Sequence, residues 1–230
     1  QGFDACGGHF LGQSIKRELN GQLGFKVGRF GLRQFPDGET YIQIHSDVCA
    51  NVIIFADLSH PDFQLLKLLL FANTVRDLGA ENITLVAPYL PYMRQDIRFK
   101  SGEGVTSKYF ARLLSDNFDS LVTVEPHFHR YQALDDLYTL RGIALPAAAP
   151  IAQWIRENVE NPVLIGPDTE SGQWVTEVAS RLGCDHRVFA KTRFGDREVA
   201  IDAGGIEGLQ GAQPIIIDDI ISTGRTMINT

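Results

Sequence analysis

Apolar segments typical of buried strands alternate along the chain with amphipathic segments typical of helices. Strands are expected at 52–58, 82–90, 120–126, 162–168, 186–194 and 214–220, and helices at 62–79, 106–117, 150–158 and 171–183. Because these strands are almost continuously apolar and separated by helices, they predict mainly parallel sheets flanked by helices on both faces. The pattern restarts near residue 150, which predicts two α/β domains, 1–143 and 144–230, with the proline-containing segment 142–150 as linker.

Composition narrows the function classes. The chain has 230 residues, 44% of them hydrophobic, and a net charge of −7, which argues against nucleic-acid partners and an anionic membrane surface. The most apolar stretch, 65–75, is too short for a membrane span and contains Lys67. Three widely spaced cysteines favour a reducing compartment, so a cytoplasmic location is expected.

The segment 214–226, PIIIDDIISTGRT, carries the strongest chemical signal. An apolar strand runs directly into Asp218 and Asp219, two carboxylates that repel each other unless a ligand, a metal or water stabilises them. The turn that follows offers backbone N–H groups and the hydroxyls of Ser222, Thr223 and Thr226, which suit a phosphate. The segment therefore predicts a site that binds a phosphate at one end and sugar hydroxyls at the other, although an acidic helix cap is a simpler alternative.

Two further segments contain residues suited to a nucleotide. In RQFPDGETYIQI, 33–44, Pro36, Asp37 and Gly38 predict a turn between two strands. In PYLPYMRQDIRF, 88–99, aromatic side chains alternate with arginines after a strand, and such a mixture suits an adenine and its phosphates. A plain hairpin and a solvated loop are the simpler alternatives.

Two strand ends contain candidate metal ligands, and one strand contains two cations. His127 and His129 follow the strand 120–126, and Asp168 ends the strand 162–168. His127 and Asp168 together are candidates to hold a Mg²⁺ ion that keeps several waters. Lys191 and Arg193 alternate along the strand 186–194, so both are expected to point to one side and to face a polyphosphate. An exposed strand face is the alternative.

The string IIIDDIISTGRT resembles the phosphoribosyl-diphosphate binding motif of type I phosphoribosyltransferases. Taken with FPDGE, PYxxxxRQD, the histidine segment and KxR, in this order, the chain resembles the ribose-phosphate pyrophosphokinase family over nearly its whole length. The stretch RQDIRFKSGEGVTSK is more similar to the shorter, archaeal-type members. The resemblance implies two tandem phosphoribosyltransferase-like domains, the first with an ATP site and the second with a ribose 5-phosphate site.

The resemblance also implies the reaction and the roles of residues. The diphosphoryl group of MgATP would pass to the C1 hydroxyl of ribose 5-phosphate, with Lys191 and Arg193 stabilising charge on the transferred group. The remaining sites implied are ATP at Phe35, Asp37, Glu39, Arg94 and Gln95, ribose 5-phosphate at Asp218, Asp219, Ser222, Thr223, Gly224, Arg225 and Thr226, and Mg²⁺ at His127 and Asp168. The family's ATP site is shared between subunits, which implies a homo-oligomer.

Three alternatives stay open at the level of sequence. A phosphoribosyltransferase would consume phosphoribosyl diphosphate, a catalytically silent subunit would regulate a synthetase, and a transcriptional regulator would use the same fold to bind DNA. The ATP-like segments argue against the phosphoribosyltransferase, and the presence of Lys191 and Arg193 argues against the silent subunit. The acidic net charge argues against the transcriptional regulator. Because the chain stops at Thr230, just after the Gly224 turn, we expect the second domain to lack a covering helix.

Overall fold

The computed structural model describes residues 25–194, 198–202 and 211–230, and in 190–202 it describes the backbone. The chain forms two compact units, Gln1–Leu145 and Pro146–Thr230, which are treated separately below. The predicted boundary after residue 143 falls within a strand of the first unit. Within the described residues, no helix is both long enough and apolar enough to cross a membrane.

The first unit is built on a four-stranded sheet in which every pairing is parallel. Its strands lie in chain order: β3 (Asn51–Phe55), β4 (Asn82–Val86), β5 (Ser120–Val124) and β6 (Arg141–Leu145). Two helices make the first two crossovers, α2 (Pro61–Asp77) and α3 (Thr106–Ser115), and the short helix η1 (Leu134–Asp136) precedes β6. All four strands therefore present their carboxyl ends at one edge, where loops can meet.

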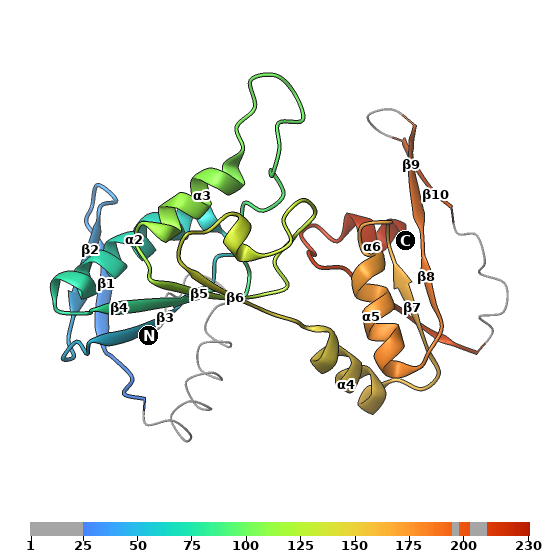
Figure 1. The fold of residues 1–230 in the computed structure, drawn as a ribbon, viewed down its shortest axis with the longest axis horizontal. Helices are drawn as coiled ribbons and strands as arrows, with labels where there is room; N and C mark the ends of the chain where they lie inside the picture. The colour runs from blue at the N-terminus through green and yellow to red at the C-terminus, as the bar shows by residue number, and fades with distance from the viewer. Residues whose placement is uncertain (1–24, 195–197, 203–210) are drawn as a thin grey trace. The chain divides into compact units, whose positions relative to one another are not determined.

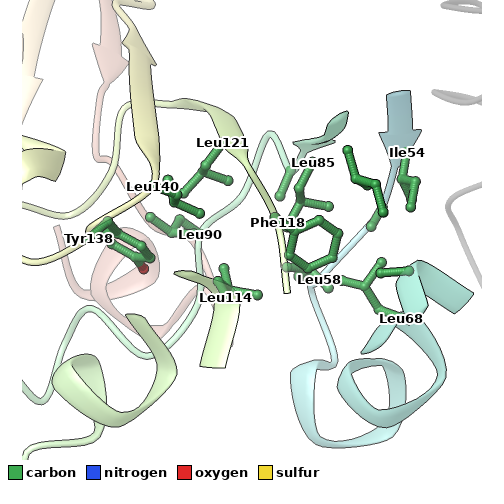
Figure 2. Packing of buried hydrophobic residues seen from close by; sticks show 14 of the residues in the cluster. Ile54, Leu58, Leu68, Leu85, Leu90, Leu114, Phe118, Leu121, Tyr138 and Leu140 are labelled. Atoms are coloured by element: carbon green, nitrogen blue, oxygen red, sulfur yellow. The ribbon is translucent and has the colours of Figure 1, made fainter. Parts of the chain in front are cut away.

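The core of this unit lies between the sheet and the two helices (Figure 2). Leu85 and Leu121 point from adjacent strands toward Leu68 on α2 and Leu114 on α3, and all four are buried. Apolar side chains at period two in the strands meet apolar side chains at helical spacing, as the sequence pattern requires.

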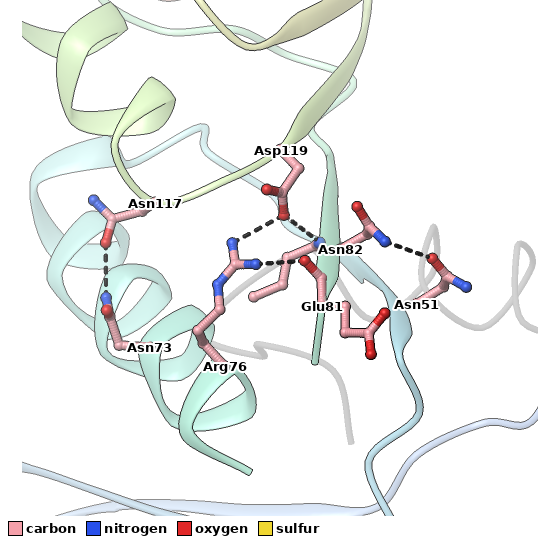
Figure 3. Close-up of polar contacts among 8 residues, drawn as sticks. Asn51, Asn73, Arg76, Glu81, Asn82, Asn117 and Asp119 are labelled. Atoms are coloured by element: carbon pink, nitrogen blue, oxygen red, sulfur yellow. Dashed lines mark hydrogen bonds and ion pairs between the residues drawn. The ribbon is translucent and has the colours of Figure 1, made fainter. Parts of the chain in front are cut away.

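Polar contacts tie the helices to the starts of the strands, at the edge opposite the carboxyl ends (Figure 3). Arg76 of α2 donates to Asp119 at 2.9 Å and to the carbonyl of Glu81 at 2.9 Å. Asp119 also accepts the backbone N–H of the buried Ile83 at 2.7 Å. Burial acts to raise the pKa of Asp119, but the hydrogen bonds from Ile83 and Arg76 prevail and the pKa is lowered.

A hairpin precedes the sheet. Strands β1 (Phe30–Gln34) and β2 (Thr40–Ile44) pair antiparallel around the predicted Pro36–Gly38 turn. Gly38 has a φ of +93°, a conformation that favours glycine, and Phe35 donates its N–H to Glu39 at 2.8 Å. The base of the hairpin is anchored by an edge-to-face contact of Phe30 with Phe71 of α2.

The second unit contains a parallel three-stranded sheet in the order β11 (Gln213–Ile216), β7 (Pro162–Gly166), β8 (His186–Val188). Its helices are α4 (Ala148–Asn158), α5 (Gly172–Leu182) and the short α6 (Arg225–Asn229). Strands β9 (Ala190–Phe194) and β10 (Glu198–Asp202) form an antiparallel pair after β8. Helix α5 ends at Gly183, whose φ of +70° is the left-handed cap that the sequence predicts.

The predicted class, two α/β domains with mainly parallel sheets, is confirmed by these sheets. Two local predictions are wrong. The start of the predicted linker is strand β6, because Ile143 and Leu145 pair beside Val122 and Val124. The single strand predicted at 186–194 is two strands, since the chain leaves the parallel sheet after Val188 and pairs with β10 instead.

Candidate functional site

In the second unit, the loop after β7 is folded around Asp168. Its Oδ1 accepts the backbone N–H groups of Ser171 at 3.1 Å and Glu170 at 3.2 Å, and the Ser171 hydroxyl donates to the Asp168 carbonyl at 2.6 Å. Gly166 makes this loop possible, because a Cβ there would lie 2.5 Å from the buried Ser171 hydroxyl. The turn therefore holds Asp168 at the carboxyl end of β7.

Asp218 and Asp219 follow β11, the strand hydrogen-bonded to β7, so they lie at the same sheet edge as Asp168. Burial, then the charge of Asp219, then the charge of Asp168 raise the pKa of Asp218 to about 6. The backbone N–H of Asp219 donates to Asp218 at 3.1 Å, which acts in the opposite direction but does not prevail. The structure thus brings together three carboxylates from two adjacent strand ends.

The turn after these aspartates is exposed. Ser222 and Thr223 face solvent, and Gly224 has a φ of +69°, which glycine adopts without strain. The Thr223 hydroxyl accepts the N–H of the exposed Arg225 at 3.4 Å, and helix α6 begins at Arg225. The side chain of Thr226 lies outside the described residues.

Lys191 and Arg193 occupy alternate positions of β9, paired in register with Ile201 and Val199 of β10. Their side chains lie outside the described part of the chain, so the direction in which they point stays a prediction. Strand β9 follows β8 directly, and β8 is parallel to β7, so the two cations come after the carboxyl end of a strand of the same sheet.

In the first unit, the loop after β4 contains Arg94 and Gln95. Arg94 is exposed, and Gln95 is fixed at the start of α3: its Oε1 accepts the Thr106 hydroxyl at 3.1 Å and its carbonyl accepts the N–H of Ser107 at 3.3 Å. With its oxygen engaged, the Gln95 side chain presents its amide N–H groups as donors. Tyr92, in the same loop, has a φ of +64° and donates its hydroxyl to Asp62 of α2.

The loop after β5 contains the two histidines. The rings of His127 and His129 meet edge to face with centroids 4.0 Å apart, and their Nε2 atoms are in hydrogen-bond contact. One ring must therefore donate and the other accept. Glu125, which introduces this loop, has a φ of +40°, a left-handed conformation that costs a residue with a side chain about 1–3 kcal/mol. Such backbone strain is typical of functional loops.

Sequence reasoning missed an ion pair between these two loops. Arg130 donates to both carboxylate oxygens of Asp96, at 2.9 Å each, and Asp96 is buried. The available signal was an acid within a loop of aromatic residues and arginines, and a cation three residues beyond His127.

The hairpin tip is exposed, and a guanidinium lies over two of its aromatic rings. Phe35, Asp37 and Glu39 face solvent, with Phe35 40% exposed. The Arg33 guanidinium lies 4.6 Å from the Phe35 ring and 4.1 Å from the Tyr41 ring. In Figure 1 the β1–β2 hairpin lies at one end of the first unit, and the loop that joins β4 to α3 lies toward the other end. That these five residues form one ATP site stays a prediction.

The donor chemistry of the strand ends fits a hard cation in part. Mg²⁺ prefers oxygen ligands, typically one or two carboxylates together with substrate phosphates and water, and Asp168, Asp218 and Asp219 offer such oxygens at one edge. Among the described residues, no group of three or more His, Cys, Asp or Glu side chains is arranged to hold a metal. His127 belongs to the other unit, so its pairing with Asp168 stays a prediction.

Comparison with known families assigns both units. A family model described as the N-terminal domain of ribose phosphate pyrophosphokinase matches residues 9–117. A second model, described as the phosphoribosyl transferase domain, matches residues 135–230.

Curated relatives agree. A ribose-phosphate pyrophosphokinase of Saccharolobus solfataricus is 37% identical, with 93% of this chain aligned to 74% of that protein. One from Methanobrevibacter smithii is 30% identical, with 95% of this chain aligned to 76% of that protein. In fold, the chain is similar to the crystal structure of phosphoribosylpyrophosphate synthetase from Mycobacterium smegmatis, with a TM-score of 0.79 at 22% identity, covering 95% of this chain and 70% of that one.

Proposed function

The chain belongs to the ribose-phosphate pyrophosphokinase family, and we propose that it transfers the β,γ-diphosphoryl group of MgATP to the C1 hydroxyl of ribose 5-phosphate. It is an enzyme of phosphoribosyl diphosphate synthesis, and the products are 5-phosphoribosyl 1-diphosphate and AMP. The N-terminal family match over residues 9–117 argues against the phosphoribosyltransferase alternative.

One observation carries the assignment of the sugar site: the carboxylates of Asp168, Asp218 and Asp219 meet at the carboxyl edge of the second sheet. Ligands of open α/β sheets bind at such an edge. In our proposal Asp218 and Asp219 accept hydrogen bonds from the ribose hydroxyls. The turn Ser222–Thr226, with Thr223, Gly224 and Arg225, holds the 5-phosphate.

The nucleotide binds to the first unit. Arg94 offers a guanidinium fork to the ATP phosphates, and Gln95 offers amide donors whose direction is fixed by the bond from Thr106. Phe35, Asp37 and Glu39 come from the hairpin of a second subunit. The exposure of that hairpin tip supports a shared site.

Magnesium accompanies the nucleotide, with Asp168 and His127 as its protein ligands in our proposal. The oxygen-rich edge around Asp168 supports this assignment. When bound, the ion neutralises charge on the phosphates and helps to orient them. For His127 to bind a cation through Nε2, its contact with His129 has to open.

The transfer itself requires in-line geometry and positive charge. The C1 oxygen of the sugar forms a bond to the β-phosphorus while the bond from that phosphorus to the α,β-bridging oxygen breaks. AMP leaves with the bridging oxygen and its electron pair, and the hydroxyl proton passes to solvent. Lys191 and Arg193 stabilise the negative charge that develops on the transferred group, as suits cations on alternate positions of one strand.

An AMP-release assay tests the reaction. The full-length protein is incubated with MgATP, with and without ribose 5-phosphate, and AMP is measured. AMP formed only when the sugar phosphate is present is the expected result. No AMP from a folded protein that binds ribose 5-phosphate would contradict the proposal and favour a catalytically silent subunit.

The shared nucleotide site makes a homo-oligomer necessary for activity. Asp37→Ala and Arg94→Ala should each inactivate the protein, while a mixture of the two variants should recover about a quarter of the activity. About half of the randomly formed pairs contain one subunit of each variant, and in such a pair one of the two shared sites is intact. If the mixture stays inactive after subunits have exchanged, the site is not shared.

A cytoplasmic location stays a prediction from the cysteine count.

A further inference from the structure

An ion pair joins the two loops of the first unit that contain the proposed nucleotide and metal residues. One nitrogen of the Arg130 guanidinium lies 2.9 Å from each carboxylate oxygen of Asp96. The Asp96 side chain is 3% exposed and that of Arg130 is 47% exposed. Asp96 directly follows Gln95, and Arg130 comes three residues after His127, so the contact joins the two loops close to these site residues.

The same two loops are also joined where they leave the sheet. Strands β4 and β5 are neighbours, and at the carboxyl end of β5 the N–H of Val124 donates to the carbonyl of Pro88 at 3.1 Å. The Thr123 hydroxyl donates to the same carbonyl at 3.4 Å. At the far end, Tyr131 donates its hydroxyl to the Asp96 carbonyl at 3.5 Å. The loops are thus fixed to each other at both ends, and the segments between contain Arg94, Gln95 and His127.

We propose that Asp96 and Arg130 are a positioning pair that couples the loop of the nucleotide residues Arg94 and Gln95 to the loop that contains the proposed metal residue His127. This inference rests on the proposed function, because it takes Arg94 and Gln95 as nucleotide residues and His127 as a metal residue. Neither member of the pair needs to touch a substrate. Their bond fixes the spacing between the two loops, so that a nucleotide and its metal meet an arranged site.

Burial gives the pair its effect. A buried carboxylate that loses its cation is left without adequate solvation, so the loop around Asp96 must move to reach water when Arg130 is replaced. That movement displaces Gln95, the adjacent residue, whose carbonyl and side chain contact the start of α3. It also releases the segment between His127 and Arg130. One substitution therefore disturbs both loops.

If the pair were merely structural, its removal would lower the stability of the protein without changing ligand binding. A second ion pair in the chain provides a control for that case. Arg76 and Asp119 form an ion pair of the same length, 2.9 Å, in the same unit but at the opposite edge of the sheet. Arg76→Met should lower the melting temperature and leave ligand affinity unchanged. Arg130→Met removes the positive charge at the edge formed by the carboxyl ends of the strands, and it keeps most of the side-chain length.

The experiment measures equilibrium binding of a non-hydrolysable ATP analogue to the full-length protein by calorimetry, over a Mg²⁺ titration, with circular dichroism to monitor folding. Arg130→Met should weaken nucleotide binding and raise the half-saturating Mg²⁺ concentration, each by about 10–100-fold, the range typical of residues that orient ligands. Arg130→Lys should recover most of the loss, because a single nitrogen makes both bonds to Asp96. The double variant Asp96→Asn/Arg130→Met should bind the nucleotide no more weakly than Arg130→Met alone.

Equilibrium binding of the nucleotide tests the positioning pair independently of catalytic turnover. If wild type binds the nucleotide but releases no AMP, the reaction is wrong while the positioning pair is still tested by the variants. Arg130→Met with both affinities within about twofold of wild type overturns the pair, whatever its melting temperature. If Arg130→Met fails to fold, the double variant replaces it, because it also lacks the ion pair and leaves no buried charge at position 96; affinities of the double variant within about twofold of wild type then overturn the pair.

Discussion

The carboxyl of Asp218 should ionise about two pH units above an ordinary aspartate. Burial, the charge of Asp219 and the charge of Asp168, in that order, raise its pKa to about 6. With that pKa the group is roughly 90% ionised at pH 7 and roughly 10% ionised at pH 5. Because it lies in the proposed ribose site, this titration should govern ligand binding in a physiologically accessible range.

The expected effect on binding follows from the ionised fraction. If ribose 5-phosphate requires ionised Asp218 as acceptor, its affinity should fall about tenfold between pH 8 and pH 5. The phosphate of the ligand also titrates in this range, so Asp218→Asn provides the reference. That variant keeps the phosphate's own pH dependence and lacks the contribution of the side chain. The ratio of the two affinities isolates Asp218.

Stability should change in the opposite sense. The pKa of Asp218 is higher in the folded protein than in the unfolded chain, so the folded protein binds the proton more tightly. The stabilising contribution is therefore complete below about pH 4 and is lost as the pH rises through about 6. Asp218→Asn, which is neutral throughout, should melt at a higher temperature than wild type at pH 7.5, and this difference should shrink toward pH 4.

Carbon-13 NMR titration of labelled aspartate carboxyls measures the pKa directly, with Asp218→Asn assigning the signal. Asp219→Asn should lower the pKa of Asp218 more than Asp168→Asn does, following the order of the two charges. Asparagine at position 168 keeps an oxygen for the N–H of Ser171, so the loop is preserved. A pKa at or below 4 for Asp218 in wild type, or one that Asp219→Asn leaves unchanged, would refute this reasoning.

Four further substitutions test Lys191 of the cation pair, the core and its exposed control position, and a helix cap. Lys191→Ala should fold and bind substrates but lose on the order of 10³-fold in AMP release, and a rate above about a tenth of wild type contradicts the role proposed for Lys191. Leu114→Ala, at a fully buried position, should cost about 2–5 kcal/mol in urea unfolding followed by circular dichroism, whereas Leu113→Ala, 41% exposed on the same helix, should cost less than about 1 kcal/mol. Gly183→Ala should cost about 1 kcal/mol in the same assay because of its φ of +70°, and an unchanged midpoint would show that the cap is not required.

Much of the fold could be predicted because local patterns coincide with tertiary burial. Leu121 and Leu85 alternate with partly exposed neighbours in their strands. Buried residues recur at helical spacing within each helix, as Leu68, Phe71 and Val75 do in α2, so the sheet and its covering helices follow from the sequence. Gly183 marked the end of a helix for a purely local reason. Local rules failed where pairing decided the outcome, as in β6, whose Pro146 flank favoured a linker although its strand pairs with β5.

The candidate site was predictable in its parts and less so in its assembly. Asp168 and Asp218 each end an apolar strand, but β7 and β11 lie about 50 residues apart in the chain, and their adjacency comes from the sheet order. Asp96 and Arg130 escaped prediction for the same reason, because a pair 34 residues apart has no local pattern. Sequence identifies which residues stand at strand ends, while strand order determines which of them meet.

The two sheet edges solve the same electrostatic problem in opposite ways. At the edge of the first unit the buried charge of Asp96 is matched by Arg130, so the loops are held together before any ligand arrives. At the edge of the second unit, Asp168 and Asp219 instead raise the pKa of Asp218, which means that the folded protein disfavours its ionised form. A ligand that binds ionised Asp218, whether through hydroxyl donors or a cation, recovers this unfavourable energy. The first edge is therefore organised for positioning, and the second is organised so that binding energy is gained only when the ligand supplies the missing donors or positive charge.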